Sequence, residues 1–290
     1  MVNEIFLNGS QSPANIPAFF LYKMSVKQFI PLAMAFVCLT ACVGCKTNSP
    51  SASRQPAATG GKCTYVLVHG AWGGGWDWKH VDRLLAADGN EVYRPTLTGQ
   101  GEHSNLSSTN IDLDTHIQDI VNVILWENLH DVVLVGHSYG GMVITGVADR
   151  VPDRIKHVVY LDALLPENGE SVDGILPPKV PRIIKDGFVI PIWVSGDPPP
   201  PHDVPQSART FSEPITFTNQ AIAQKLPATY ILTVDQGNSP EQDDFYRCYE
   251  RAKARGWTTH IMEGDHNVQR SHPTELVKLL EQAPSESGDR

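Results

Sequence analysis

A serine between two glycines is the first candidate for chemistry in this chain. The segment Gly136–Gly140 reads Gly-His-Ser-Tyr-Gly, follows the apolar run 132–135 and precedes a stretch of helical composition. A strand, a G-x-S-x-G motif and a helix form a nucleophile elbow, in which a sharp turn exposes the serine hydroxyl above a sheet. Glycines suit the strained angles and close packing of such a turn. We therefore predict that Ser138 is a nucleophile.

A serine hydroxyl needs a neighbouring base, because it is a poor nucleophile at neutral pH. His266 lies in the segment Glu263–Asn267, after the last expected strand and before the last expected helix. Four other histidines lack this combination of chain order and position: His69, His137, His260 and His272. We predict that His266 is the base.

The base in turn needs an acid to orient it, and several aspartates are candidates. Asp235 directly follows an expected strand and precedes a loop, which is the usual place for this acid. Asp162 ends the preceding expected strand, and Asp243 and Asp244 follow in the loop after Asp235. Asp235 is the preferred prediction, and the other three aspartates stay open as alternatives.

Acyl transfer also needs donors for the oxygen that becomes negatively charged, and backbone N–H groups serve this purpose. One donor is expected from Tyr139, directly after the nucleophile. The other is expected from Ala71, in the loop His69–Trp72 after the first expected strand.

The elements expected around these residues alternate between strands and helices. The expected strands are Thr64–His69, Glu91–Leu97, Val132–Val135, His157–Leu161, Thr229–Val234 and Trp257–Met262. The expected helices are Trp78–Ala87, Asp112–Leu129, the segment 142–148, Asp243–Arg255 and Thr274–Gln282. This alternation predicts an α/β fold with a mostly parallel, doubly wound sheet. The proline-rich interval 164–226 breaks the rhythm, and we predict an inserted cap there rather than a structureless loop.

Composition excludes one class of partner. The chain has 290 residues and a formal net charge of −9, without a cluster of Lys and Arg. A nucleic-acid partner is therefore not expected. The cysteines lack metal-binding spacing, and the expected chemistry needs neither a metal nor a cofactor.

The first part of the chain has the layout of an export signal. A short basic segment starts at Met24, an apolar core follows, and small residues precede Cys42. This ending resembles a bacterial lipobox, which implies a lipid anchor on Cys42. We expect a leader over residues 1–41, and a true start at Met24 because residues 1–23 lie upstream of the signal. Residues 42–62 then form a flexible tether, and residues 63–285 form the folded domain. We expect an exported lipoprotein, anchored to a membrane and facing the periplasm or exterior.

Four motifs together resemble the α/β-hydrolase superfamily. They are Val68–Trp72, Pro95–Gly99, Gly136–Gly140 and Gly264–His266. The most similar branch contains small carboxylesterases, methyl-ester hydrolases and hydroxynitrile lyases. The resemblance implies Ser138 as nucleophile, His266 as base, and Ala71 and Tyr139 as oxyanion donors.

The resemblance is weaker for the lyases of that branch. They carry a threonine and a lysine at positions where this chain has Gly70 and Asn267. We therefore expect a serine hydrolase that cleaves carboxylic esters through a Ser-His-Asp triad and an acyl-enzyme. The alternatives are a lactonase or other acyl hydrolase, a cofactor-free haloperoxidase, and a non-catalytic binding protein on the surface. The oligomeric state is not predicted.

Overall fold

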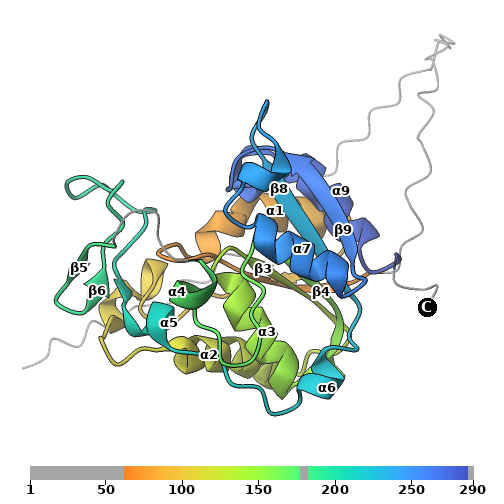
Figure 1. Cartoon of the computed structure of the whole chain (residues 1–290), viewed down its shortest axis with the longest axis horizontal. Coiled ribbons are helices and arrows are strands. Elements are labelled where there is room, and N and C mark those ends of the chain that lie inside the picture. Colours follow the sequence, from red (N-terminus) through yellow and green to blue (C-terminus); the bar gives the residue numbers. More distant parts are fainter. Residues whose placement is uncertain (1–61, 177–181, 287–290) are drawn as a thin grey trace, which may run out of the picture. The chain divides into compact units, whose positions relative to one another are not determined.

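The computed structural model describes residues 62–176 and 182–286 (Figure 1). The expected leader, the start at Met24 and the lipid anchor at Cys42 lie outside the described residues, as does the tether except for Lys62. In the two described stretches, no helix has both the length and the apolar composition needed to cross a membrane.

A parallel sheet forms the centre of the described domain. It has six strands in the order β2-β1-β3-β4-β8-β9, and every neighbouring pair is parallel. The strands are β1 (Thr64–Val68), β2 (Glu91–Tyr93), β3 (Val132–His137), β4 (Ile155–Leu161), β8 (Ala228–Val234) and β9 (Thr258–Glu263). The carboxyl ends of parallel strands meet at one edge, and the loops that carry the motifs all leave from that edge.

Helices cover both faces of this sheet because its strands are apolar on both sides. In β1, Tyr65 and Leu67 face one apolar cluster, whereas Val66 and Val68 face another. The first cluster includes buried residues of α1 (Lys79–Ala87) and α9 (Pro273–Gln282). The second includes buried residues of α2 (Leu113–Trp126), α3 (Gly140–Arg150) and α7 (Tyr246–Ala254). The predicted doubly wound α/β fold is confirmed.

Some element boundaries differ from those expected. The second strand ends at Tyr93 rather than Leu97, shortly before Pro95, which has no N–H to donate to a neighbouring strand. The third strand continues to His137 and so carries the chain directly to Ser138. The helix expected from Asp112 starts one residue later, because Asp112 caps it by accepting a hydrogen bond from the Thr115 N–H at 2.9 Å.

The interval between β4 and β8 is an inserted cap with structure of its own. Its described helices are α4 (Val172–Ile175), α5 (Arg209–Ser212) and α6 (Gln220–Ala223). Its described strands β5 (Ile184–Lys185), β6 (Phe188–Val189) and β7 (Gln206–Ser207) form a small antiparallel sheet. The described part of this interval thus carries secondary structure, as expected of a cap rather than a structureless loop.

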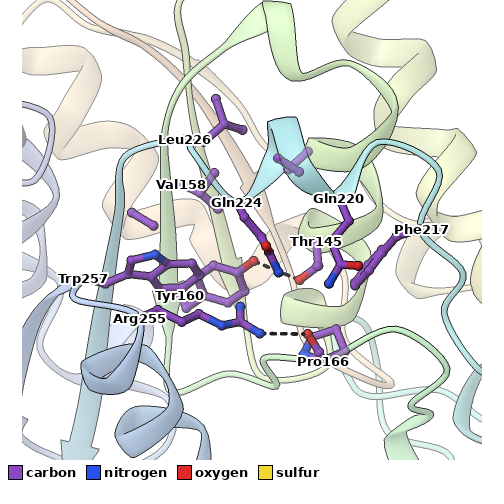
Figure 2. A pocket seen from close by; sticks show the side chains of 13 residues that line it. Thr145, Val158, Tyr160, Pro166, Phe217, Gln220, Gln224, Leu226, Arg255 and Trp257 are labelled. Atoms are coloured by element: carbon purple, nitrogen blue, oxygen red, sulfur yellow. Dashed lines mark hydrogen bonds between the residues drawn. The ribbon is translucent and has the colours of Figure 1, made fainter.

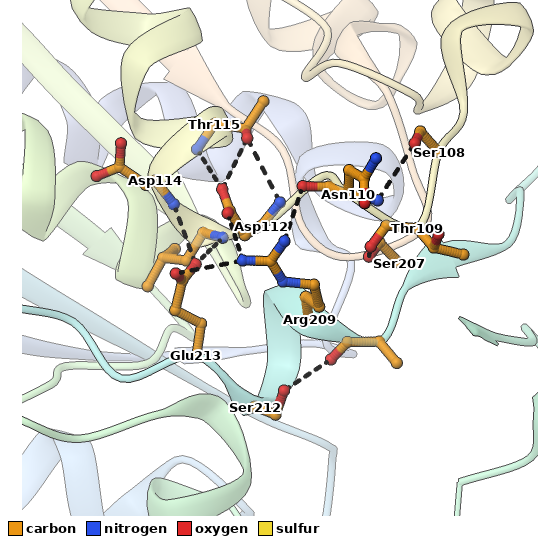
Figure 3. Close-up of polar contacts among 12 residues, drawn as sticks. Ser108, Thr109, Asn110, Asp112, Asp114, Thr115, Ser207, Arg209, Ser212 and Glu213 are labelled. Atoms are coloured by element: carbon orange, nitrogen blue, oxygen red, sulfur yellow. Dashed lines mark hydrogen bonds and ion pairs between the residues drawn. The ribbon is translucent and has the colours of Figure 1, made fainter.

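Polar contacts fix the cap to the start of α2 (Figure 3). The Arg209 guanidinium lies 2.9 Å from the Asp112 carboxylate, which also caps α2. Glu213 accepts a hydrogen bond from the Leu113 N–H at 2.8 Å, where the helix dipole favours a negative charge. Arg209 is half exposed, so its ion pair alone stabilises little. Together these contacts attach α5 to α2 at two adjoining points.

The end of the cap closes over a separate apolar pocket (Figure 2). Phe217 and Leu226 from the cap line this pocket together with Tyr160 and Trp257 from the sheet region. The Tyr160 and Trp257 rings stack with centroids 5.4 Å apart. Neither Ser138 nor His266 lines this pocket, so it is not the site of the predicted chemistry.

Candidate active site

The predicted turn at Ser138 has the geometry of a nucleophile elbow. Ser138 follows β3 directly and has a φ of +54°, a left-handed conformation that is strained for a residue with a side chain. A Cβ on Gly136 would lie 2.7 Å from the Ile144 Cδ1, and a Cβ on Gly140 would lie 2.8 Å from the Val68 oxygen. Both contacts are too short to tolerate, so the two glycines of the motif are sterically required.

His266 follows β9, and two neighbouring rings hold its imidazole. The Phe245 ring stacks on it at 5.1 Å with an interplanar angle of 7°, and the His137 ring lies 4.5 Å away on a tilted plane. His137 Nε2 donates a hydrogen bond of 2.7 Å to the backbone oxygen of His266, since a carbonyl can only accept. Burial holds the pKa of His137 well below its usual value, so His137 stays neutral and serves as this donor.

The carboxylate that meets His266 belongs to Asp162. Its Oδ2 lies 2.5 Å from His266 Nδ1, and its Oδ1 accepts a hydrogen bond of 3.1 Å from the Thr233 N–H. Asp162 is only 1% exposed. A carboxylate with two such partners is held in one orientation, and it fixes the imidazole tautomer with a proton on Nδ1.

The structure pairs His266 with Asp162 rather than with Asp235, the preferred prediction. Asp235 follows β8, begins a turn closed by the Asn238 N–H at 3.0 Å, and is exposed. Asp162 follows the neighbouring strand β4 with a φ of +43°, and this turn in its backbone directs its carboxylate toward His266. Among the described residues, no hydrogen bond joins Asp235 to His266.

Asp243, another alternative for the acid, lies beside the same site. Its Oδ1 accepts a hydrogen bond of 2.7 Å from the Phe245 N–H, so it supports the ring that stacks on His266. Burial, followed by the negative charge of Asp162, raises the pKa of Asp243 to about 6. Asp244 lines the same cavity.

The two predicted oxyanion donors are available. Among the described residues, the backbone N–H groups of Ala71 and Tyr139 make no hydrogen bond. The buried His69 donates from Nδ1 to the Gly70 oxygen at 2.8 Å and accepts at Nε2 from the Leu97 N–H at 3.0 Å. The Gly70 oxygen and the Ala71 N–H belong to one planar peptide and point in opposite directions. By binding the Gly70 oxygen, His69 therefore fixes the direction of the Ala71 N–H.

Burial also keeps this hydrogen-bonding pattern in place. It lowers the pKa of His69 to about 4, so the ring is neutral near pH 7 and keeps one donor and one acceptor nitrogen.

Two cavities meet at Ser138 and His266. The first holds about 980 Å³ of empty space and is bordered by the loop after β8, including Asp235 and Asp243. The second holds about 760 Å³ and is bordered by Ala71, Trp193 and an ion pair between Arg270 and Asp77. Ser138, His266 and Ala71 thus face one space, with room for a small organic substrate.

Comparison with known proteins identifies the family. A family model described as "Alpha/beta hydrolase family" matches residues 65–279. The chain belongs to the alpha/beta hydrolase family. This hydrolase is 36% identical over 239 residues to a carbendazim hydrolyzing esterase from Nocardioides sp. (strain SG-4G), and the match covers 74% of the chain and 97% of the relative.

Two further matches extend the comparison. The hydrolase is 33% identical over 114 residues to methylesterase 1 of Arabidopsis thaliana, covering 39% of the chain and 43% of the relative. An extracellular alpha/beta-hydrolase from a Paenibacillus species has the same fold, with a TM-score of 0.59, 24% identity, and coverage of 76% of this chain and 98% of the other.

The sequence did not reveal the residues that support Ser138 and His266 in this hydrolase. His69 and His137 lie inside recognised motifs, and their position beside a glycine loop and the serine is a usable signal. Asp162 directly follows an apolar strand, which is a pattern typical of the acid, but Asp235 shows the same pattern. A choice between the two requires the spatial order of β4, β8 and the loop after β9.

Proposed function

We propose that this hydrolase cleaves small carboxylic esters through an acyl-enzyme, with Ser138 as nucleophile, His266 as base and Asp162 as the orienting acid. The observation that carries the proposal is the 2.5 Å contact between Asp162 and His266 at a cavity that Ser138 also lines. The family and the named relatives support an ester-cleaving hydrolase. The proposed triad names the atoms that would carry out the cleavage.

The first half of the reaction forms the acyl-enzyme. Because Asp162 holds the proton on Nδ1 of His266, Nε2 has a free lone pair that takes the proton of the Ser138 hydroxyl. The Ser138 oxygen then bonds to the ester carbonyl carbon, and the carbonyl electrons move to oxygen, where the N–H groups of Ala71 and Tyr139 stabilise the charge. The carbon–oxygen bond to the alcohol breaks, and the alcohol leaves with the proton from His266.

The second half repeats these steps with water. His266 takes a proton from water, whose oxygen bonds to the acyl carbon and again places negative charge in the oxyanion hole. The bond to Ser138 breaks, Ser138 regains its proton from His266, and the carboxylic acid leaves. Asp162 stabilises the imidazolium in both halves without taking its proton.

The names of the relatives support an ester substrate and suggest which esters to try. One relative is named a carbendazim hydrolyzing esterase and others are named methylesterases. A useful panel therefore combines p-nitrophenyl esters of increasing acyl length with aromatic methyl esters and carbendazim.

The test compares two serine variants of the full chain on that panel. Ser138→Ala is expected to reduce turnover by about 10³-fold or more, because the nucleophile is lost. Ser239→Ala is the matched control, since Ser239 lines the same cavity but is not bonded to the triad. Turnover by Ser138→Ala equal to that of the parent would refute the proposal.

A further inference from the structure

The cap forms hydrogen bonds with the loop His69–Trp72, which carries the proposed oxyanion donor Ala71. These bonds are made at Trp72, the residue after Ala71. The Trp72 N–H donates to Gln206 Oε1 at 2.8 Å, and the Trp72 oxygen accepts from the Val204 N–H at 2.9 Å. The indole Nε1 donates to the Val189 oxygen at 3.1 Å. All three partners belong to the cap. Trp72 has a φ of +64°, which is strained for a residue with a side chain, so these contacts hold a conformation that the chain alone disfavours.

Gln206 is itself held in one orientation. It is 1% exposed, and its Nε2 donates to the Thr210 Oγ1 at 2.8 Å, while the Thr210 hydroxyl donates to the Ser207 oxygen at 2.7 Å. Because the Trp72 N–H can only donate, the Gln206 atom that faces it is the carbonyl oxygen. A buried amide with both ends bonded forms a rigid link between the cap and the loop.

The same cap element also reaches the second oxyanion residue. The Phe211 ring of α5 lies 6.1 Å from the Tyr139 ring, and the Tyr139 hydroxyl lies 2.9 Å from His116 Nδ1. His116 Nε2 donates to the Thr98 oxygen at 3.0 Å, so its Nδ1 is left as an acceptor for the Tyr139 hydroxyl. Phe211 of the cap thus packs against both Trp72 and Tyr139, on the two sides of the oxyanion hole.

The arrangement leaves Ala71 between two fixed points. On one side, His69 binds the Gly70 oxygen, and on the other side, Gln206 binds the Trp72 N–H. Because Gln206 occupies the Trp72 N–H, that group is not available as an oxyanion donor, whereas Ala71 lines the cavity that Ser138 also lines. Loss of the Gln206 contact would free the peptide between Ala71 and Trp72 to rotate.

We propose that Gln206 of the cap is a positioning residue for the oxyanion hole. It acts through Trp72 and sets the direction of the Ala71 N–H. This inference rests on the proposed function, because it assigns Gln206 to the hole that serves Ser138. The cap would then contribute to the rate of the chemical step as well as to substrate choice.

The test measures steady-state kinetics and labelling by a fluorophosphonate, whose phosphoryl oxygen occupies the same hole when Ser138 attacks phosphorus. Gln206→Met, of similar length without the acceptor, is expected to lower kcat about 10- to 100-fold, part of the loss seen when a donor is removed. KM should stay within about twofold, because the hole stabilises the transition state rather than the bound ester. The labelling rate at Ser138 should fall by a factor similar to that in kcat.

Two further variants separate positioning from folding. Gln206→Glu keeps an acceptor for the Trp72 N–H and is expected to recover most of kcat. Arg209→Met loosens the cap at α2 without touching Gln206, and it should leave kcat within about twofold of the parent. If Gln206→Met does not fold, Thr210→Val serves in its place, since it removes the partner that orients Gln206.

The outcomes distinguish the two proposals. Absence of labelling at Ser138 in the parent protein would overturn the proposed function and this inference with it. Normal labelling of the parent, with kcat losses that are equal in Gln206→Met and Arg209→Met or a change confined to KM, would overturn only the role of Gln206.

Discussion

Asp162 and Asp235 follow two neighbouring parallel strands, and only the carboxylate of Asp162 meets the imidazole of His266. The two strands end at the same edge of the sheet, so both aspartates start close to the site. What separates them is the backbone after each strand, which turns Asp162 inward and leaves Asp235 exposed. In the proposed triad, the order Ser138, Asp162, His266 keeps the acid between nucleophile and base in the chain.

Removal of the Asp162 charge is expected to disable the base. Asp162→Asn should lower kcat about 10⁴-fold, because an amide nitrogen facing Nδ1 favours the wrong tautomer and cannot stabilise the imidazolium. The measurement is kcat on a p-nitrophenyl ester, with circular dichroism to verify folding. Asp235→Asn is the matched control and should stay within a few-fold of the parent. The reverse pattern would restore Asp235 as the acid.

A methyl group on Gly141 is expected to destabilise the elbow. Its Cβ would lie 2.0 Å from the backbone oxygen of Leu164, which cannot move aside as a side chain can. Gly141→Ala should lower the free energy of unfolding by about 2 kcal/mol or more, as overpacking does. Urea denaturation measures this loss. Gly174→Ala, where the new Cβ would lie 3.6 Å from the Ser171 Oγ, should not lower stability.

Acid is expected to weaken the fold through its buried histidines. Burial lowers the pKa of His116 from 6.5 to about 4, so the folded state binds fewer protons than the unfolded state. The associated stability is fully present above pH 6.5 and is lost as the pH falls toward 4. Between pH 7 and pH 5 this single group accounts for about 2 kcal/mol.

The variant His116→Gln isolates that contribution. Urea unfolding at several pH values should show a shallower loss of stability between pH 7 and pH 5 than in the parent. His80→Gln replaces an exposed histidine and should leave the slope as it is. An unchanged slope in His116→Gln would show that His116 does not drive the acid sensitivity.

We propose, from the sequence alone, that the chain is exported and carries a lipid on Cys42. In a bacterial host, the parent should incorporate labelled palmitate and sediment with membranes, because acyl chains partition into the bilayer. Cys42→Ala should abolish both properties, whereas Cys45→Ala, three residues further on, should retain them. Parent protein that carries no palmitate label and stays in the soluble fraction would contradict the proposal.

The sequence was sufficient for the sheet and for the nucleophile elbow. Long apolar runs such as β8 and the strand before Ser138 have a strong local signal, and G-x-S-x-G places the serine relative to them. The acid was not decided in this way, because Asp162 and Asp235 have the same local pattern and differ only in the turn that follows. Cap strands of two residues, such as Gln206–Ser207, have no periodicity to detect.

The proposed placement of the acid after β4, before the cap, has an evolutionary consequence for the loop after β8. Asp235, Asn238, Ser239 and Gln242 line the first cavity, yet no partner of Ser138 or His266 in the triad lies among them. Selection can therefore vary these four side chains to suit new esters while the triad stays whole. The loop is a natural place to diversify a library when a new substrate is wanted.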